Sequence, residues 1–136
     1  MSGEARNLAH TVKAVRPMVP AKDFEISRRF YVDLGFQPHM LTDRLVEMHL
    51  GPYSFILQDY YVQQWADNFV MHMLVSDLGV WWDHICALDL PSRYGVKSPG
   101  APKVESWGLV AGMIDPSGVL WRIAEIPALN SNRGTI

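Results

Sequence analysis

The chain has 136 residues, of which 49% are hydrophobic and 19% charged, so one folded domain with a buried core is expected. Its formal net charge of −2 offers no basic field for a phosphate backbone, and nucleic-acid binding is not expected. The single cysteine, Cys86, cannot form an internal disulfide and favours a reducing, cytoplasmic location. No signal-peptide pattern opens the chain, and no apolar run is long enough to cross a membrane.

The composition of the two ends predicts a flexible N-terminus over residues 1–12 and a flexible tail over 128–136, which leaves a single domain over 13–127. A strand over residues 14–20 is expected at a sheet edge, because Pro17 and Pro20 cannot donate to a ladder. Asp23 caps a helix over 23–34, which Gly35 ends. Three strand-like runs follow, over residues 36–41, 45–50 and 54–58.

The second half of the chain repeats this plan. A strand is expected over residues 69–75, then a helix from the cap Asp77 to Leu88, then weaker strands over 92–96, 109–114 and 120–125. The two aspartate caps lie 54 residues apart in the numbering, from 23 to 77. This spacing indicates an α+β domain with two βαβββ modules, over about 13–60 and 68–126.

Four stretches carry a resemblance to a known family. They are FEISRRFYVDLGF (24–36), VSDL (75–78), ESWGLVAGMIDPSG (105–118) and DPSGVLWRIAE (115–125). In order and spacing they resemble the glyoxalase/bleomycin-resistance/dioxygenase (vicinal oxygen chelate) superfamily, and most of all its bleomycin-resistance branch. The resemblance implies a curled mixed sheet around a cleft. It also implies a homodimer, with modules paired across the two chains in some members.

The resemblance also implies where a metal would bind in catalytic relatives. The four ligand positions correspond here to Arg16, Ile56 or Leu57, Val70 and Arg122. None of these side chains offers a lone pair suited to a divalent ion, so no metal cofactor is expected. An alternative is a displaced divalent metal site, which would serve a lyase or dioxygenase and would be made of His72, Glu47 and His49.

A ligand cleft is expected in place of the metal. Arg16 and Arg122 would favour an anionic or carbonyl-rich ligand, unless Glu47, Glu105 or Glu125 neutralises them. In the bleomycin-resistance branch a Trp-Gly peptide and a second aromatic ring sandwich a flat part of the drug. Here Trp107-Gly108 matches the first half, and Leu45 stands where some members carry the ring. The predicted ligand-binding residues are therefore Trp107, Gly108, Arg122, Arg16, His72 and Leu45.

Three further expectations concern aromatic residues and the cysteine. Trp121 should face the helix-packed core, and Cys86 should be a small buried apolar residue. Of Trp81 and Trp82, one should pack on the sheet and the other could form an interface, unless both lie in the core. The leading hypothesis is a non-catalytic, metal-free homodimer that binds a small, partly aromatic molecule. The alternatives are a metal-dependent enzyme of the same superfamily and a structural module with an empty cleft.

Overall fold

A computed structural model describes residues 6–127 of the chain and contains two four-stranded sheets. The first module supplies sheet A, in the order β1-β4-β3-β2, with β1 parallel to β4 and the other pairs antiparallel. Helix α1 connects β1 to β2. The elements are β1 (Met18–Pro20), α1 (Phe24–Leu34), β2 (Gln37–Thr42), β3 (Leu45–Leu50) and β4 (Tyr53–Gln58).

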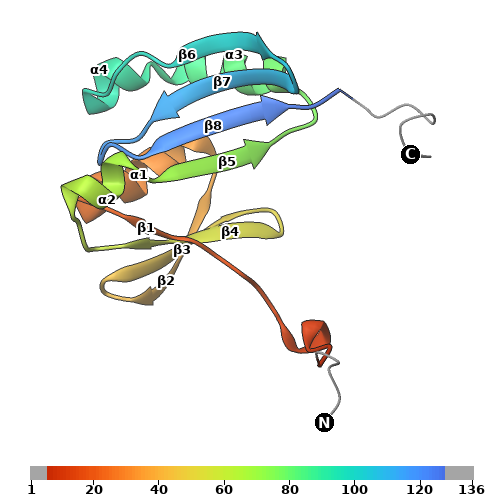
Figure 1. The fold of residues 1–136 in the computed structure, drawn as a ribbon. Helices are drawn as coiled ribbons and strands as arrows, with labels where there is room; N and C mark the ends of the chain where they lie inside the picture. Colours follow the sequence, from red (N-terminus) through yellow and green to blue (C-terminus); the bar gives the residue numbers. More distant parts are fainter. Residues whose placement is uncertain (1–5, 128–136) are drawn as a thin grey trace.

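The second module repeats this topology in sheet B, in the order β5-β8-β7-β6 (Figure 1). Its elements are β5 (Val70–Leu74), α3 (Leu78–Leu88), α4 (Leu90–Tyr94), β6 (Gly100–Glu105), β7 (Gly108–Ile114) and β8 (Leu120–Glu125). The predicted α+β fold with two βαβββ modules is therefore confirmed. Within one chain the two sheets stay separate, because no strand of sheet A pairs with a strand of sheet B among residues 6–127.

The two predicted helix caps are also confirmed. The Asp23 carboxylate accepts a hydrogen bond from the Ile26 N–H at 3.1 Å, and Asp77 accepts from the Val80 N–H at the same distance. Each bond satisfies a donor that the first turn leaves without a helical partner. Gly35 ends α1 with φ +120°, a conformation that a residue with a Cβ rarely adopts.

The structure differs from the prediction around residues 92–96. A strand was predicted there, but the structure has the short helix α4, and the strand β6 begins later, at Gly100. Pro91 lies in the first turn of α4, where its fixed φ suits a helix, and Gly95 ends α4 in the left-handed conformation with φ +66°. A second short helix, α2 (Gln63–Asp67), connects the modules and was not predicted.

The first strand is shorter than the expected span of 14–20. Pro20 ends β1, and Pro17 precedes it and still accepts a hydrogen bond from the Ile56 N–H through its carbonyl. Strand β1 lies at the edge of sheet A, as the two prolines predicted.

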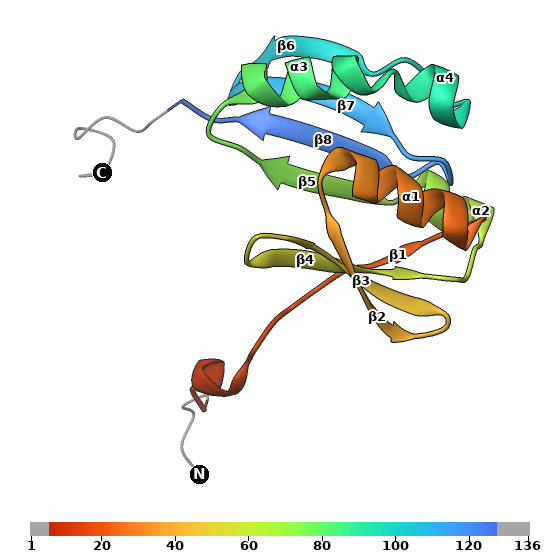
Figure 2. The same cartoon turned by 180° about the vertical axis from the view of Figure 1, so that it is seen from behind.

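One core joins the two modules. Helices α1 and α3 contact each other, and Figure 2 shows both on the same side of the strands of sheet B. Tyr31 of α1 donates to Asp115 in the turn between β7 and β8, and the Trp121 indole donates to Tyr31. Trp121 is 3% exposed and packs against Tyr31, Phe36 and Phe55, so its predicted position in the core is confirmed.

The N-terminal segment before β1 leads away from the rest of the molecule (Figures 1 and 2). Its one helical turn is the 3-10 helix Ala9–Thr11, and its apolar side chains Leu8, Val12 and Val15 are exposed. The predicted flexible tail over 128–136 lies outside the described residues, as do residues 1–5. None of the helices in the described part of the chain has the length and apolar character needed to cross a bilayer.

Candidate functional site

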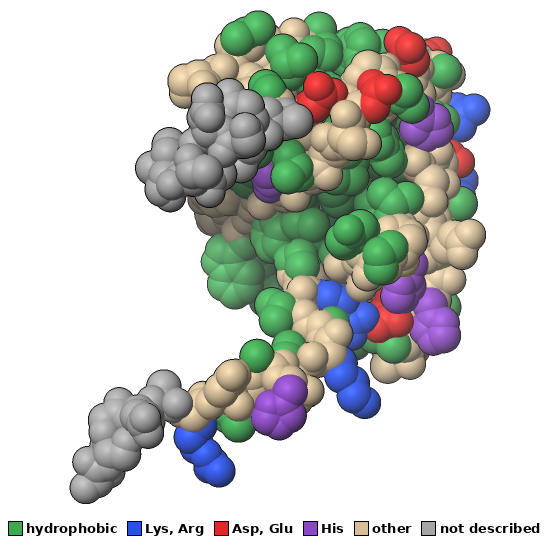
Figure 3. All heavy atoms as spheres, turned by 90° about the vertical axis from the view of Figure 1, so that its right-hand side faces the viewer, with side chains coloured by type: hydrophobic (Ala, Val, Ile, Leu, Met, Phe, Trp, Pro, Cys, Tyr) green, Lys and Arg blue, Asp and Glu red, His purple; other side chains and the backbone are tan. Residues whose placement is uncertain are grey.

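A large hollow lies between the two modules. It has a volume of about 890 Å³ and is bounded by the β3–β4 hairpin, by β5 and by the start of α3. Figure 3 shows hydrophobic side chains gathered around this hollow. The lining is largely apolar and includes Phe36, Leu50, Phe69, Met71, Met73 and Trp81. A volume and lining of this kind are typical of pockets that bind small molecules.

Strand β5 borders this hollow along its whole length. Every residue from Val70 to Leu74 contributes to the lining, on both faces of the strand. In sheet B, β5 pairs only with β8, so its other edge has no strand partner within residues 6–127. The hollow therefore reaches from the core side of β5, around its free edge, to the face of sheet B that α3 does not cover.

Of the six predicted ligand-binding residues, only His72 lines this hollow. The His72 ring also lies beside the Trp107 ring, with centroids 6.1 Å apart and planes at 51°. Across the sheet, His72 and Arg122 are Cα partners in the β5–β8 pair. His72 therefore connects the hollow to the other predicted residues on this face of sheet B, which we call the open face.

A row of four residues crosses the open face. His72 on β5 pairs with Arg122 on β8, Arg122 with Gly112 on β7, and Gly112 with Gly100 on β6. Trp121 and Ile123, the neighbours of Arg122 in sequence, point into the core, so Arg122 points to the open face. A second, smaller hollow of about 220 Å³ lies here, lined by residues that include Gly100, Lys103, Glu105, Gly112 and Arg122.

The two predicted arginines differ in their charge partners. Arg16 forms an ion pair with Glu47, which also lies 3.1 Å from the His49 ring nitrogen. Glu47 accepts hydrogen bonds from both His49 and Arg16, and these bonds hold the pKa of Glu47 below its usual value. The bond from His49 has the larger effect. The alternative that a carboxylate neutralises Arg16 is therefore confirmed.

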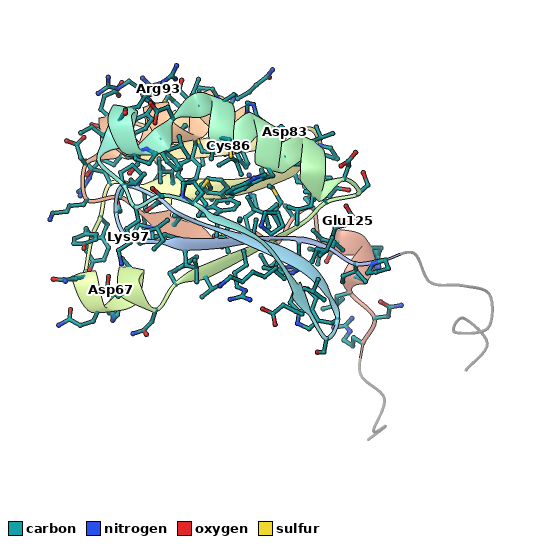
Figure 4. The ribbon with its side chains drawn as sticks, turned by 90° about the horizontal axis from the view of Figure 1, so that it is seen from above. Asp67, Asp83, Cys86, Arg93, Lys97 and Glu125 are labelled. Carbon is teal, nitrogen blue, oxygen red and sulfur yellow. The ribbon has the colours of Figure 1, made fainter. Side chains whose placement is uncertain are left out.

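Arg122 has no ion pair within residues 6–127. Glu125, one of the partners predicted for Arg122, lies at the end of β8 (Figure 4). Its carboxylate instead accepts a hydrogen bond from the Leu78 N–H at 2.8 Å. Glu105 borders the same small hollow but lies beyond ion-pairing distance.

Gly108 has a structural reason to be glycine. A Cβ at this position would lie 2.6 Å from the Glu125 carbonyl oxygen, a distance that real Cβ atoms do not show. The resemblance assigns Gly108 to contact with a ligand ring, whereas the structure explains the glycine by the approach of the neighbouring strand. Contact between Gly108 and a ligand stays a prediction.

The three residues of the alternative metal site do not lie close together within one chain. Glu47 and His49 lie on sheet A, where Glu47 is engaged by Arg16, and His72 lies on sheet B. Among the described residues, no three His, Cys, Asp or Glu side chains come close enough together to hold a metal ion. The four positions of the family metal also lack suitable donors, so the residues present do not fit that metal.

Leu45 and Arg16 lie apart from the other predicted ligand-binding residues. Leu45 is on β3 and shares the face of sheet A that carries Glu47 and His49, because Val46 and Met48 between them point into the core. The predicted set is therefore divided. Leu45 lies on sheet A and Arg16 just before its strand β1, whereas His72, Gly108 and Arg122 lie on sheet B and Trp107 in the turn between β6 and β7.

Two other predictions can be compared with the structure. Cys86 lies on α3 (Figure 4) and is exposed, so its predicted burial was wrong: it points away from the core that Ile85 enters. Trp81 and Trp82 are both half-buried and pack against the core, and Trp81 also lines the large hollow. Gly100, Lys103 and Gly112 were not predicted as site residues, although glycines within strands often mark a close approach of another group.

No protein-family model matches the chain, and no curated protein matches it significantly. Solved structures do share its fold. A bleomycin-binding protein in complex with bleomycin has a TM-score of 0.72 and 21% identity, covering 84% of this chain and 98% of that one. An antibiotic-binding protein from Streptomyces sp. CB03234 has a TM-score of 0.63 and 22% identity, covering 85% and 98%. A lactoylglutathione lyase from Agrobacterium tumefaciens has a TM-score of 0.61 and 17% identity, covering 84% and 94%.

Proposed function

We propose that this protein binds a small, partly aromatic molecule without catalysis and without a metal ion. The observation that carries the proposal is the apolar hollow of about 890 Å³ that opens beside His72, next to the Trp107 ring. Apolar walls supply most of the affinity in such pockets, and a few polar groups at the rim orient the ligand. The fold shared with bleomycin-binding and antibiotic-binding proteins supports the same function.

The residues at the family metal positions support binding without a metal. Arg16 and Arg122 are permanently charged cations, and the other positions, Val70 and Ile56 or Leu57, carry hydrocarbon side chains. The shared fold also includes a lyase, so the fold alone does not separate a binder from an enzyme. The side chains at these positions support a binder rather than an enzyme.

A homodimer is part of the proposal. Met18 on β1 is 43% exposed, and Val70 and Leu74 on β5 are 52% and 57% exposed, so the edges of both sheets present apolar side chains to solvent. The projecting N-terminal segment adds Val15, which is 90% exposed. A symmetric second copy could cover these surfaces and bring Arg16 and Leu45 of sheet A toward the open face of sheet B. The cytoplasmic location stays a prediction.

The proposal can be tested on the full chain, purified without added metal or chelator. We expect less than stoichiometric metal by elemental analysis, a dimer by light scattering, and a rise in melting temperature with planar aromatic compounds. The His72→Ala variant should weaken that binding, whereas the exposed His10→Ala control should not. Stoichiometric metal that is lost in His72→Ala would contradict the proposal and favour the enzyme. If no aromatic compound raised the melting temperature, ligand binding would lose its support.

A further inference from the structure

Arg122 is a half-buried residue on the open face of sheet B, and its guanidinium has no ion pair within residues 6–127. A guanidinium with no carboxylate partner remains available to an anionic ligand. Two other charged groups line the small hollow beside it, Lys103 and Glu105, and their opposite charges offset one another. The hollow therefore keeps one net positive charge, at Arg122.

The glycine beside Arg122 leaves space that the fold does not require. A Cβ built at Gly112 would meet no atom within 4 Å, in contrast to Gly108, where the Cβ would collide with the backbone of Glu125. Gly100 follows Gly112 in the same row across the sheet. Two glycines in register leave bare backbone beside the guanidinium, and a flat group can lie on such a surface.

Aromatic groups border this surface on its other side. His72 is the Cα partner of Arg122, and the Trp107 ring lies against His72. A ring that rests on the glycine surface would have the guanidinium at its edge and aromatic side chains nearby. An Arg side chain prefers a planar oxyanion such as a carboxylate, which it can bind through two parallel hydrogen bonds.

We propose that the open face of sheet B selects a flat aromatic carboxylate, which Arg122 binds through its anionic group above the surface formed by Gly112 and Gly100. This inference rests on the function proposed above and adds the charge of the ligand. Arg16 does not supply this selectivity, because Glu47 already neutralises it.

The test compares two probes of equal size by calorimetry on the full chain at low salt, 2-naphthoate and the neutral 2-naphthalenemethanol. The wild type should bind the acid at least about tenfold more tightly than the alcohol, the size expected for a charge-assisted hydrogen bond. Arg122→Gln should remove this preference by weakening binding of the acid until it matches that of the alcohol. Arg29→Gln, which changes an exposed arginine on α1, should keep the preference.

A second variant tests the glycine surface separately. Gly112→Ala should fold with an unchanged or raised melting temperature, because its methyl group meets no protein atom, and it should weaken binding of both probes. If the wild type bound both probes equally, or if Arg122→Gln kept the preference, the anion site would be refuted while the proposed binding function stood. If neither probe bound, both proposals would fail together.

Discussion

The phenol of Tyr31 on α1 donates a 2.6 Å hydrogen bond to Oδ2 of Asp115, which lies 84 residues further along the chain in the turn between β7 and β8. The same phenol oxygen accepts from the Trp121 indole N–H at 2.8 Å. Oδ1 of Asp115 accepts from the N–H groups of Ser117 and Val119, at 2.8 and 2.9 Å. A helix of the first module is thus tied to a turn of the second through a buried carboxylate.

This relationship predicts the effect of removing one hydroxyl group. Tyr31→Phe should lower the free energy of unfolding by about 1–3 kcal/mol, because it leaves a buried carboxylate oxygen and a buried indole N–H without a partner. Urea denaturation followed by fluorescence measures this loss. Tyr53→Phe is the matched control, because Tyr53 is 75% exposed. This substitution should change the free energy of unfolding by no more than about 0.5 kcal/mol. Equal stability of Tyr31→Phe and the wild type would show that this bond does not help to hold the modules together.

Asp115 also predicts how stability depends on pH. Burial is the largest influence on this carboxyl and raises its pKa, against the hydrogen bonds from Tyr31 and the turn, which lower it. Protonation is thus easier in the folded state. The stability that this group contributes is fully present below the pKa of the unfolded chain, and it is lost as the pH rises through the higher pKa of the folded state.

Asp115→Asn should remove this dependence while keeping an acceptor for the turn. The free energy of unfolding of the wild type, relative to the variant, should fall as the pH rises above the ordinary carboxyl value of about 3.9. Denaturation curves at several pH values measure the difference. Asp43→Asn, an exposed change in the β2–β3 turn, serves as control. A difference that rose with pH would mean that the hydrogen bonds outweigh burial and that the pKa is lowered.

Local patterns allowed most of the fold to be predicted. The caps Asp23 and Asp77 depend on bonds to residues three positions away, and the hairpin Asp115–Gly118 depends on turn residues, so neither needs knowledge of the rest of the chain. Helix α4 was missed because a five-residue helix gives no periodic pattern, although Pro91 and Gly95 were its signals. Strand β6 was missed because Gly100, Ala101 and Pro102 have low strand propensity. The strand is stabilised by pairing with β7, which involves Gly100 and the residues from Lys103 to Glu105.

The candidate site was harder to predict, for a different reason. The ion pair between Arg16 and Glu47 was foreseen as an alternative, whereas binding without a metal stays a prediction. The large hollow lies between modules, and its lining from Phe36, Leu50 and Trp81 depends on tertiary packing that no local pattern reports. Likewise, sequence alone could not distinguish Gly108, which the backbone of Glu125 requires, from Gly112, which borders open space.

These two glycines of β7 predict opposite outcomes for the same substitution. Gly108→Ala should lower the free energy of unfolding by about 1–3 kcal/mol or more, because the Cβ must displace the backbone of β8 at Glu125. Gly112→Ala should leave stability unchanged or raise it by up to about 1 kcal/mol, since alanine loses less backbone entropy on folding. Chemical denaturation of both variants measures the contrast. Equal effects would mean that the close approach at Gly108 relaxes at little cost.

A last prediction concerns the contact between α1 and α4. The Tyr94 hydroxyl on α4 donates to Oδ2 of Asp33 on α1, and Arg93 lies 3.2 Å from the same oxygen. Three influences raise the pKa of Tyr94 to about 12. Burial is the largest, and the hydrogen bond to Asp33 and the negative charge of Asp33 add to it. Absorbance at alkaline pH should therefore show a tyrosine that ionises near this value, which Tyr94→Phe removes.

The sign of the stability effect follows from the raised pKa. The neutral phenol is favoured in the folded state, so its contribution is fully present below the ordinary tyrosine pKa of about 10 and is lost as the pH rises through about 12. Over this range the wild type should lose stability relative to Tyr94→Phe. Asp33→Asn should shift the Tyr94 midpoint downward, because it removes the negative charge that opposes ionisation. An unchanged midpoint in Asp33→Asn would assign the whole shift to burial and leave Asp33 without influence on this contact.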